Sequence, residues 1–337
     1  MRVNEPRPLG RTSVRTTAMS FGAAPIGNFL RPFSESMATD MVSQAWDLGM
    51  RHFDTAPLYG HGLSEHRLGH ALRGYPRDQY VISTKVGRRL EPAAPGTFDS
   101  GLWVDPAPFA AYYDYSYDGI MRSVEESLQR LLTDHVDILL VHDVDRYTHG
   151  DAQPEMFRQA VEEGFPALVR LREEGVVSAI GFGVNETDVC REAVRRTDAD
   201  CVLLAGRYTL LEQDPLDELL PLCEKRGVSV ILGGVYNSGV LATGAIEGAK
   251  FNYAPAPPEV LRRTARIHAI CRAHDVALPA AALGFAAAHP AVASVCVGSR
   301  TPEQQSGSAA LFGARIPRQL WDDLRDAGLL RPDAPTP

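Results

Sequence analysis

Four polar side chains lie in three short motifs. Each side chain is at the end of a run of apolar residues or a few residues after it. The motifs read FDTAPLYG, VISTKVG and LLVHD, and they contain Asp54, Tyr59, Lys85 and His142. A phenol with its usual pKa of about 10 is a poor base near neutrality, but a nearby ammonium group lowers that pKa. Lys85 would supply the ammonium, and Asp54 would keep a buried lysine charged. The set predicts acid–base chemistry at Tyr59, with His142 orienting the substrate oxygen.

The elements that must position these residues are strands of a parallel sheet. Short apolar runs alternate with helical segments to the end of the chain, and no Pro- or Ser-rich linker interrupts them. This pattern favours one (β/α)8 TIM barrel over residues 1–337, with a doubly wound sheet as the alternative. Side chains that follow barrel strands meet at the C-terminal mouth, where active sites are built. The predicted strands are Ala18 to Gly22, Met50 to Asp54, Tyr80 to Lys85, Asp137 to His142, Ala179 to Gly183, Cys201 to Leu204, Val228 to Leu232 and Ala291 to Val297.

Taken singly, each of these side chains has a structural explanation. Asp54 could cap the next turn, Lys85 could be a solvated strand end, and His142 could be a core histidine. Their convergence on successive strand ends favours a functional site over these alternatives.

The predicted helices fit this alternation of strands and helices. Ser36 to Leu48 reads as a helix, and Pro215 to Lys225 reads as another that begins after a capping Asp214. The uncharged stretch from Val276 to Ser299 contains two prolines and many alanines, which makes it weak as a membrane span. It predicts a buried helix followed by a strand.

Two long segments follow strands and are therefore expected at the barrel mouth. Gly87 to Tyr117 exceeds the length of an ordinary connection and is rich in aromatic residues, which is typical of a functional lid. Gly233 to Pro258 is rich in glycine, which allows close approach of the backbone to a ligand. We expect substrate choice to depend on the first segment and on Asp143 to His149. An N-terminal β-hairpin and a C-terminal extension account for the rest of the length. The first segment carries, among its aromatic residues, Trp103, Phe109, Tyr112, Tyr113, Tyr115 and Tyr117.

Composition excludes several classes of protein. The chain is 45% hydrophobic and 23% charged, which is typical of a globular protein and argues against disorder. The net charge of −8 argues against nucleic acid and anionic membranes as partners. Five widely spaced cysteines without a C-x-x-C pair, and an N-terminus without a secretory signal, favour a cytoplasmic protein with reduced thiols. The oligomeric state is not determined by the sequence.

Motifs for other chemistries are weak. His66 and His70, with His61 nearby, have helical spacing, but the H-E-x-x-H order is missing and we predict no metal. GFGVNE lacks the third glycine and the acidic residue of a Rossmann fingerprint, and neither a Walker A loop nor a G-x-S-x-G elbow is present.

The three motifs together resemble the aldo-keto reductase superfamily, and the resemblance covers nearly the whole chain. It implies a (β/α)8 barrel, a nicotinamide dinucleotide extended across the barrel mouth, and hydride transfer without a metal. It also implies that Tyr59 is the acid/base, that Lys85 and Asp54 tune it, and that His142 orients the substrate.

Further motifs resemble the branch of this superfamily that contains L-fucose (D-threo-aldose 1-) and pyridoxal dehydrogenases. These motifs are DYSYDGIMRSVEESLQRL, HDVDRYTHG, AIGFGVNE, LLAGRYTLLEQ and GGVYNSGVLATG. The resemblance implies oxidation of an aldose hemiacetal (L-fucose, L-galactose or D-arabinose) to a lactone. The alternative is oxidation of pyridoxal to 4-pyridoxolactone, and less favoured readings are a general aldehyde reductase or a cofactor-sensing binding subunit.

The expected cofactor site departs from the superfamily pattern. The usual Ser-Asn pair reads Gly183 and Val184, so Asn185 would hold the nicotinamide amide. Two cations that bind the 2'-phosphate of NADP are missing, which favours NAD, although Arg300 could still reach such a phosphate. The cofactor contacts implied by the resemblance are Gly22, Asn185, Arg207, Gly233, Tyr236, Ser238, Gly239, Gly298, Ser299, Arg300, Gln304 and Ser308, and the substrate contacts are Trp103, His142 and Tyr236.

Overall fold

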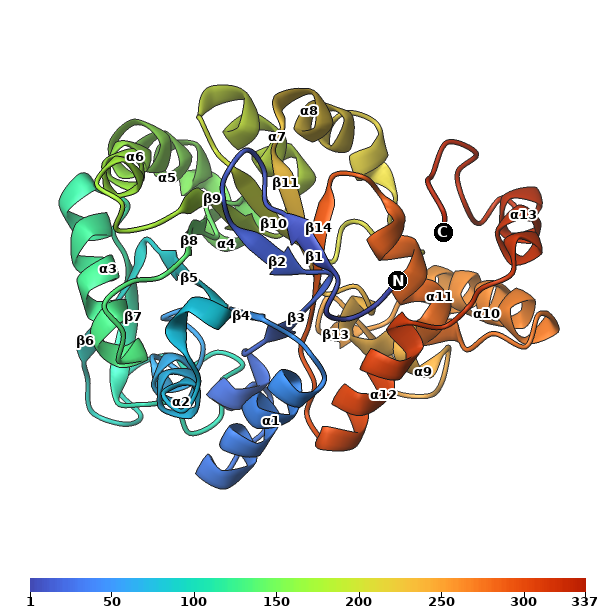
Figure 1. The fold of residues 1–337 in the computed structure, drawn as a ribbon, viewed down its shortest axis with the longest axis horizontal. Helices are drawn as coiled ribbons and strands as arrows, with labels where there is room; N and C mark the ends of the chain where they lie inside the picture. Colours follow the sequence, from blue (N-terminus) through green and yellow to red (C-terminus); the bar gives the residue numbers. More distant parts are fainter.

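Eight parallel strands form a closed barrel in the computed structural model, which describes residues 1–337. Each strand pairs with the next in chain order, and β14 pairs with β3 to close the barrel. Figure 1 shows the strands at the centre with the helices outside them. All eight predicted strands are confirmed, with ends shifted by one or two residues. They are β3 (Met19–Gly22), β4 (His52–Asp54), β5 (Val81–Val86), β8 (Ile138–His142), β9 (Ala179–Val184), β10 (Cys201–Ala205), β11 (Ser229–Gly233) and β14 (Val292–Val297).

The predicted N-terminal hairpin lies across the bottom of the barrel. Strands β1 (Pro6–Pro8) and β2 (Arg15–Thr17) are antiparallel and cross the barrel centre in Figure 1. The hairpin side chains Leu9 and Val14 are buried in a small apolar cluster with inward-facing residues of five barrel strands. The hairpin therefore seals the end of the barrel opposite the mouth.

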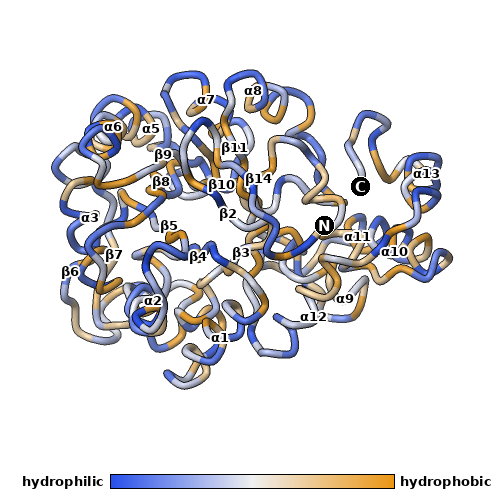
Figure 2. Tube along the Cα trace, in the orientation of Figure 1, coloured by the Kyte–Doolittle hydropathy of each residue, from blue (hydrophilic) through white to orange (hydrophobic).

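The helices cover the outside of the barrel, and the tube in Figure 2 carries polar residues mainly along their outer sides. The helix expected over Ser36 to Leu48 is α1, whose N-cap hydroxyl at Ser34 accepts a hydrogen bond from the Met37 amide. The full set is α1 (Glu35–Asp47), α2 (Leu63–Leu72), α3 (Tyr117–Leu131), α4 (Arg146–His149), α5 (Gln153–Gln159), α6 (Phe165–Glu173), α7 (Thr187–Arg196), α8 (Leu219–Arg226), α9 (Val240–Thr243), α10 (Pro258–Ala273), α11 (Leu278–Ala288), α12 (Pro302–Phe312) and α13 (Arg318–Asp326).

One predicted helix is wrong at its start. The segment from Asp214 to Leu216 forms a separate 3-10 turn, and α8 begins only at Leu219. The Asp214 side chain makes no capping hydrogen bond, and Glu218 precedes α8 with a non-helical backbone. Pro215 suits the first position of a short turn as well as that of a helix, so the sequence signal did not separate the two.

The uncharged stretch divides as expected into α11, in which nearly every side chain is buried, and strand β14. None of the helices combines the length and the apolar character that crossing a bilayer requires.

Both long mouth segments contain structure of their own. Strands β6 (Arg88–Pro92) and β7 (Phe109–Tyr113) pair antiparallel, and we call residues 88–113 the mouth hairpin. The second segment contains α9 and a small hairpin made of β12 (Lys250–Phe251) and β13 (Ala254–Pro255).

Candidate active site

The strand ends bring Asp54 and Lys85 into direct contact. Asp54 closes β4 and Lys85 lies near the end of β5, and these two strands are neighbours. The Lys85 ammonium donates to both oxygens of Asp54, at 2.9 and 3.1 Å, and to the carbonyl of Thr55 at 2.7 Å. Ser83 donates to Asp54 at 2.7 Å from the next strand. With exposed fractions of 1% for Lys85 and 4% for Asp54, this ion pair is fully desolvated and has a fixed geometry.

Tyr59 lies directly against this ion pair. The Lys85 Nζ atom is 4.7 Å from the centroid of the Tyr59 ring. The His142 ring approaches from the end of β8, with 6.1 Å between the ring centroids. A side chain at Gly27 would come within 2.8 Å of the Tyr59 backbone, so close packing fixes the position of the tyrosine. The structure therefore brings all four predicted residues together.

The charge states follow from burial and from this ion pair. Burial alone would lower the pKa of Lys85, but Asp54 and Tyr59 raise it above its ordinary value, so the lysine stays charged as predicted. Burial raises the pKa of the Tyr59 phenol, and Lys85 offsets this only in part. The expectation that the phenol pKa lies below its ordinary value is therefore wrong for this structure, because burial outweighs the ammonium.

His142 is a neutral imidazole. Burial, reinforced by Arg88 and Lys85, lowers the pKa of His142 well below its ordinary value. Its Nδ1 atom is buried without a hydrogen-bond partner, and its Nε2 atom lies 3.4 Å from a carboxylate oxygen of Asp143. The Tyr115 hydroxyl donates to the His142 carbonyl at 2.8 Å and thereby supports the end of the strand. A neutral imidazole here can hydrogen-bond a substrate oxygen without supplying a charge.

Aromatic side chains from three loops cover Tyr59. The Trp103 ring lies 5.3 Å from the Tyr59 ring, centroid to centroid. Phe29, from the loop after β3, contacts Trp103 at 5.1 Å and Tyr253 of the small hairpin at 5.4 Å. Of the aromatic residues predicted to line the mouth in the first long segment, Trp103 contacts the Tyr59 ring and Tyr115 hydrogen-bonds the His142 carbonyl. Phe29 and Tyr253 were missed because nothing in their local sequence shows that three loops meet.

Asn185, the expected partner of the nicotinamide amide, is held firmly at the mouth. Its side-chain NH2 donates to Asp143 at 3.0 Å and to Asp145 at 3.3 Å. Its backbone NH donates to Asp145 at 2.9 Å, and Arg207 donates to its carbonyl at 2.8 Å. Arg207 thus supports Asn185 and also binds Glu212 and Asn252, so its place in the structure is that of a supporting residue.

Tyr236 is held by the helix that follows the last barrel strand. Its hydroxyl donates to Ser308 on α12 at 3.3 Å, which ties the loop after β11 to that helix. Of the three predicted substrate contacts, Trp103 and His142 lie beside the Tyr59 ring, and Tyr236 is tied to α12. In the same loop, the exposed Ser238 accepts a hydrogen bond from the Tyr253 amide at 3.0 Å.

The segment after β14 meets the loop after β3, and an arginine of each lies at the contact. Gln304 accepts from the Arg300 amide at 3.0 Å, close to the start of α12. The Arg31 guanidinium donates to the Arg300 carbonyl, and burial together with Arg31 lowers the pKa of Arg300. Neither arginine has an acidic partner. Sequence reasoning missed Arg31, because its motif after β3 carries no sign that the loop reaches Arg300.

These residues fit a dinucleotide. Two arginines without acidic partners, beside the start of a helix, are the donors that phosphate groups require. Two predicted cofactor contacts are glycines with open space beside them. A Cβ atom at Gly239, in the loop after β11, or at Gly307, on α12, would meet no atom within 4 Å. Gly22 and Gly298 instead pack backbone to backbone, with 3.2 Å from a Cβ at Gly22 to the Gly298 amide. Gly233 ends β11, and the Ser299 side chain is buried.

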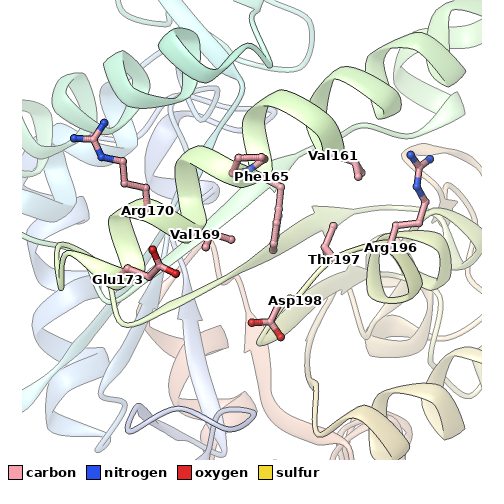
Figure 3. Close-up of a pocket in the computed structure, with 9 residues that line it drawn as sticks. Val161, Phe165, Val169, Arg170, Glu173, Arg196, Thr197 and Asp198 are labelled. Atoms are coloured by element: carbon pink, nitrogen blue, oxygen red, sulfur yellow. The ribbon is translucent and has the colours of Figure 1, made fainter.

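Other features of the surface do not compete with the mouth. A groove between α6 and α7 has Phe165 in its floor and Arg170 and Arg196 at its ends (Figure 3), but it contains none of the predicted site residues. His66 and His70 are exposed on α2, and no group of His, Cys, Asp or Glu side chains is arranged to hold a metal ion.

The barrel, with Asp54, Tyr59, Lys85 and His142 at its mouth, defines an oxidoreductase of the aldo-keto reductase class. The sequence profile of the Aldo/keto reductase family matches residues 18–328, so the chain belongs to this family. Members of the family use NAD(P)(H) and act on small-molecule substrates.

Two curated relatives cover almost the entire chain. The chain is 44% identical to pyridoxal 4-dehydrogenase of Microbacterium luteolum, over 98% of this chain and 99% of that protein. It is 41% identical to D-threo-aldose 1-dehydrogenase of a Pseudomonas species, over 95% of both chains. L-galactose dehydrogenase of Arabidopsis thaliana is 31% identical over 91% of this chain and 87% of its own length. These likenesses confirm that the protein is an oxidoreductase that acts on CH–OH groups.

Solved structures confirm the fold. An aldo-keto reductase from Bacillus halodurans, in its holo form, superimposes with a TM-score of 0.75 over 95% of both chains, at 24% identity. A glycerol dehydrogenase from Gluconobacter oxydans gives 0.76 over 99% of this chain and 97% of its own, at 20% identity.

Proposed function

We propose that the protein oxidises an aldose hemiacetal at its anomeric carbon to the lactone, with L-fucose as the first substrate to test and L-galactose and D-arabinose as further ones. The observation that carries this proposal is the buried Lys85–Asp54 ion pair beneath Tyr59, beside a neutral His142. The D-threo-aldose and L-galactose dehydrogenases among the relatives support the choice of substrate class.

Each residue has a defined part in the proposed reaction. A nicotinamide cofactor bound at the barrel mouth would supply the acceptor for the hydride that leaves the anomeric carbon. Tyr59 removes the proton of the hemiacetal hydroxyl, and the adjacent Lys85 ammonium stabilises the phenolate that this step requires. Neutral His142 orients the hydroxyl oxygen, and Asp54 keeps Lys85 protonated in a site from which water is excluded. Because burial raises the pKa of Tyr59, the rate of oxidation is expected to rise as the pH increases above neutrality.

Replacement of Tyr59 by phenylalanine tests this assignment. General acid–base catalysis contributes about 100- to 10,000-fold, and Tyr59→Phe should lower kcat by that order while the affinity for cofactor stays the same. Steady-state kinetics and cofactor fluorescence titration measure the two quantities. Tyr75→Phe, at a tyrosine after α2 whose ring stacks on Trp46, is the matched control and should match the wild type. Normal turnover by the Tyr59 variant would refute the role.

Pyridoxal is the second candidate substrate, because one relative is a pyridoxal 4-dehydrogenase. The Trp103 ring beside Tyr59 offers a surface on which a pyridine ring could stack. Pyridoxal also forms a cyclic hemiacetal, so the same residues would give 4-pyridoxolactone. Paired assays of NADH formation with L-fucose and pyridoxal separate the two proposals by kcat/KM. Failure to reduce the cofactor with either compound, or with a panel of aldoses and aldehydes, would favour a cofactor-sensing subunit instead.

For the cofactor we propose NAD over NADP. The segment after β14 lacks the pair of cations expected for a 2'-phosphate. The contact between Arg31 and Arg300 is the observation that favours NADP, because it places a second guanidinium near the first. Comparison of kcat/KM for NAD and NADP decides between them, and a preference for NADP that Arg31→Gln abolishes would overturn the proposal.

A further inference from the structure

Asp143 is a carboxylate beside the reacting centre that the proposed mechanism does not use. It follows His142 directly and adopts a positive φ of 47°, a backbone conformation that is uncommon for residues with a side chain. Its amide donates to the Gly183 carbonyl at 2.9 Å, and its carbonyl accepts from the Tyr115 hydroxyl at 3.2 Å. Neighbouring elements therefore hold a strained residue in place, which is a feature of functional sites.

Two donors from different elements hold the carboxylate itself. Arg88, the first residue of the mouth hairpin, donates to Oδ2 at 2.7 Å. Asn185, at the end of β9, donates to Oδ1 at 3.0 Å. A carboxylate accepts about four hydrogen bonds, so Asp143 keeps acceptor capacity after these two. Burial raises the pKa of Asp143 to about 6, and Arg88 opposes this, so the group is charged at neutral pH.

The Asp143 carboxylate lies next to His142, which orients the substrate in the proposed reaction. The Oδ2 atom is 3.4 Å from the Nε2 atom of His142, the imidazole that orients the substrate oxygen. The two oxygens of adjacent carbons in a sugar are separated by about one hydrogen-bond length. A sugar whose anomeric hydroxyl contacts His142 can therefore present its neighbouring hydroxyl to Asp143.

We propose that Asp143, held by Arg88 and Asn185, binds the hydroxyl group on the carbon next to the reacting carbon, and so selects substrates that carry such a hydroxyl. This inference rests on the proposed aldose oxidation and names the part of the sugar that the site recognises. When a deoxygenated analogue occupies the site, the Asp143 carboxylate lacks the hydrogen-bond donor that the hydroxyl would supply. Such analogues are therefore disfavoured. It also repels substrates that carry a carboxylate near the reacting carbon.

The test compares two sugars and two forms of the enzyme. L-fucose carries the neighbouring hydroxyl and 2-deoxy-L-fucose does not. With the wild type, loss of that hydroxyl should lower kcat/KM about 10- to 100-fold, the range expected for a hydrogen bond to a charged group. With Asp143→Asn, L-fucose should lose a similar factor, and the two sugars should then differ by less than about threefold. NAD affinity and the melting temperature of the variant establish that the site and fold are intact.

Asp145→Asn is the matched control. This buried carboxylate also binds Asn185, but it caps α4 through Thr148 and does not contact His142. It should therefore lower kcat/KM for both sugars by the same factor. The same result for Asp143→Asn would make Asp143 a structural residue and overturn the inference. A wild type that oxidises both sugars equally would overturn it while leaving the proposed function standing, whereas a wild type that oxidises neither would end both.

Discussion

At the scale of single residues, burial shifts the pKa of the groups near the barrel mouth toward the neutral form, and at Lys85 neighbouring groups outweigh it. The same desolvation that makes His142 neutral raises the pKa of Tyr59 and Asp143. The sequence identifies the four converging residues because each ends or closely follows a strand. It could not give the direction of the Tyr59 pKa, which depends on how completely Trp103 and its neighbours exclude water.

A pH-dependent stability is expected from His52, a buried histidine on β4. Burial lowers the pKa of His52 from 6.5 to about 4, and its Nε2 atom pairs with the Ser83 hydroxyl at 2.9 Å. Between these pH values His52 binds more protons in the unfolded chain than in the native protein, so its contribution to the free energy of unfolding rises with pH. At 1.36 kcal/mol per pKa unit, the rise has an upper limit of about 3 kcal/mol. Asp143 contributes with the opposite sign, because its native pKa is raised to about 6 and the native protein binds more protons below that value.

His52→Gln isolates the contribution of His52. Urea unfolding at pH 4.5 and at pH 7 should show a smaller difference in stability for this variant than for the wild type. His66→Gln, at an exposed position on α2, should keep the full difference. An unchanged pH dependence in the His52 variant would contradict the assignment.

At the scale of elements, the sequence predicts that two long loops lie at the barrel mouth, but it does not predict which of their side chains contact the site. The first long segment forms the mouth hairpin, and of its aromatic rings Trp103 is the one that contacts Tyr59. Tyr112 stacks on Arg89 and the Tyr117 hydroxyl accepts from Arg170. Sequence shows that a segment is aromatic, whereas the backbone bridge between Trp103 and Phe29, which the sequence does not reveal, places the tryptophan beside the site.

Trp103 is expected to cover the substrate. Trp103→Ala removes the ring that packs between Tyr59 and Phe29, and it should raise KM for the sugar about tenfold or more by admitting water and removing a stacking surface. Leu102→Ala is the matched control, because the neighbouring side chain is exposed and the contact of this residue with Leu30 uses only its backbone. Steady-state kinetics measure both. Equal KM values for the Trp103 variant and the wild type would remove the tryptophan from the substrate site.

At the scale of the whole molecule, residues that stabilise the fold and residues of the predicted site lie at opposite ends of the barrel. The bottom is sealed by the N-terminal hairpin, and the predicted site lies at the mouth. The eight strands could be predicted because a barrel needs continuous apolar runs at regular spacing. The link between Arg31 and Arg300, 269 residues apart, could not, because only the closed sheet brings β3 and β14 together.

Leu9→Ala tests this separation. Leu9 is fully buried in the apolar cluster at the bottom of the barrel, so its truncation should cost about 2–5 kcal/mol of stability. The value of kcat/KM at a temperature well below unfolding should stay unchanged, because the bottom face of such barrels serves stability. Leu132→Ala, at an exposed leucine, should change neither quantity. Denaturant unfolding and steady-state kinetics measure the two effects, and a large loss of activity in a folded Leu9 variant would argue against the separation.

The reactivity of the five cysteines can report local unfolding of the barrel. All are free and buried, and burial raises the pKa of each thiol, so none reacts while the barrel is closed. They lie on α7, β10, α8, α10 and β14, all in the second half of the chain. The rate at which an alkylating reagent labels them under native conditions therefore measures how often that half of the barrel opens, while motion of the mouth hairpin passes unseen.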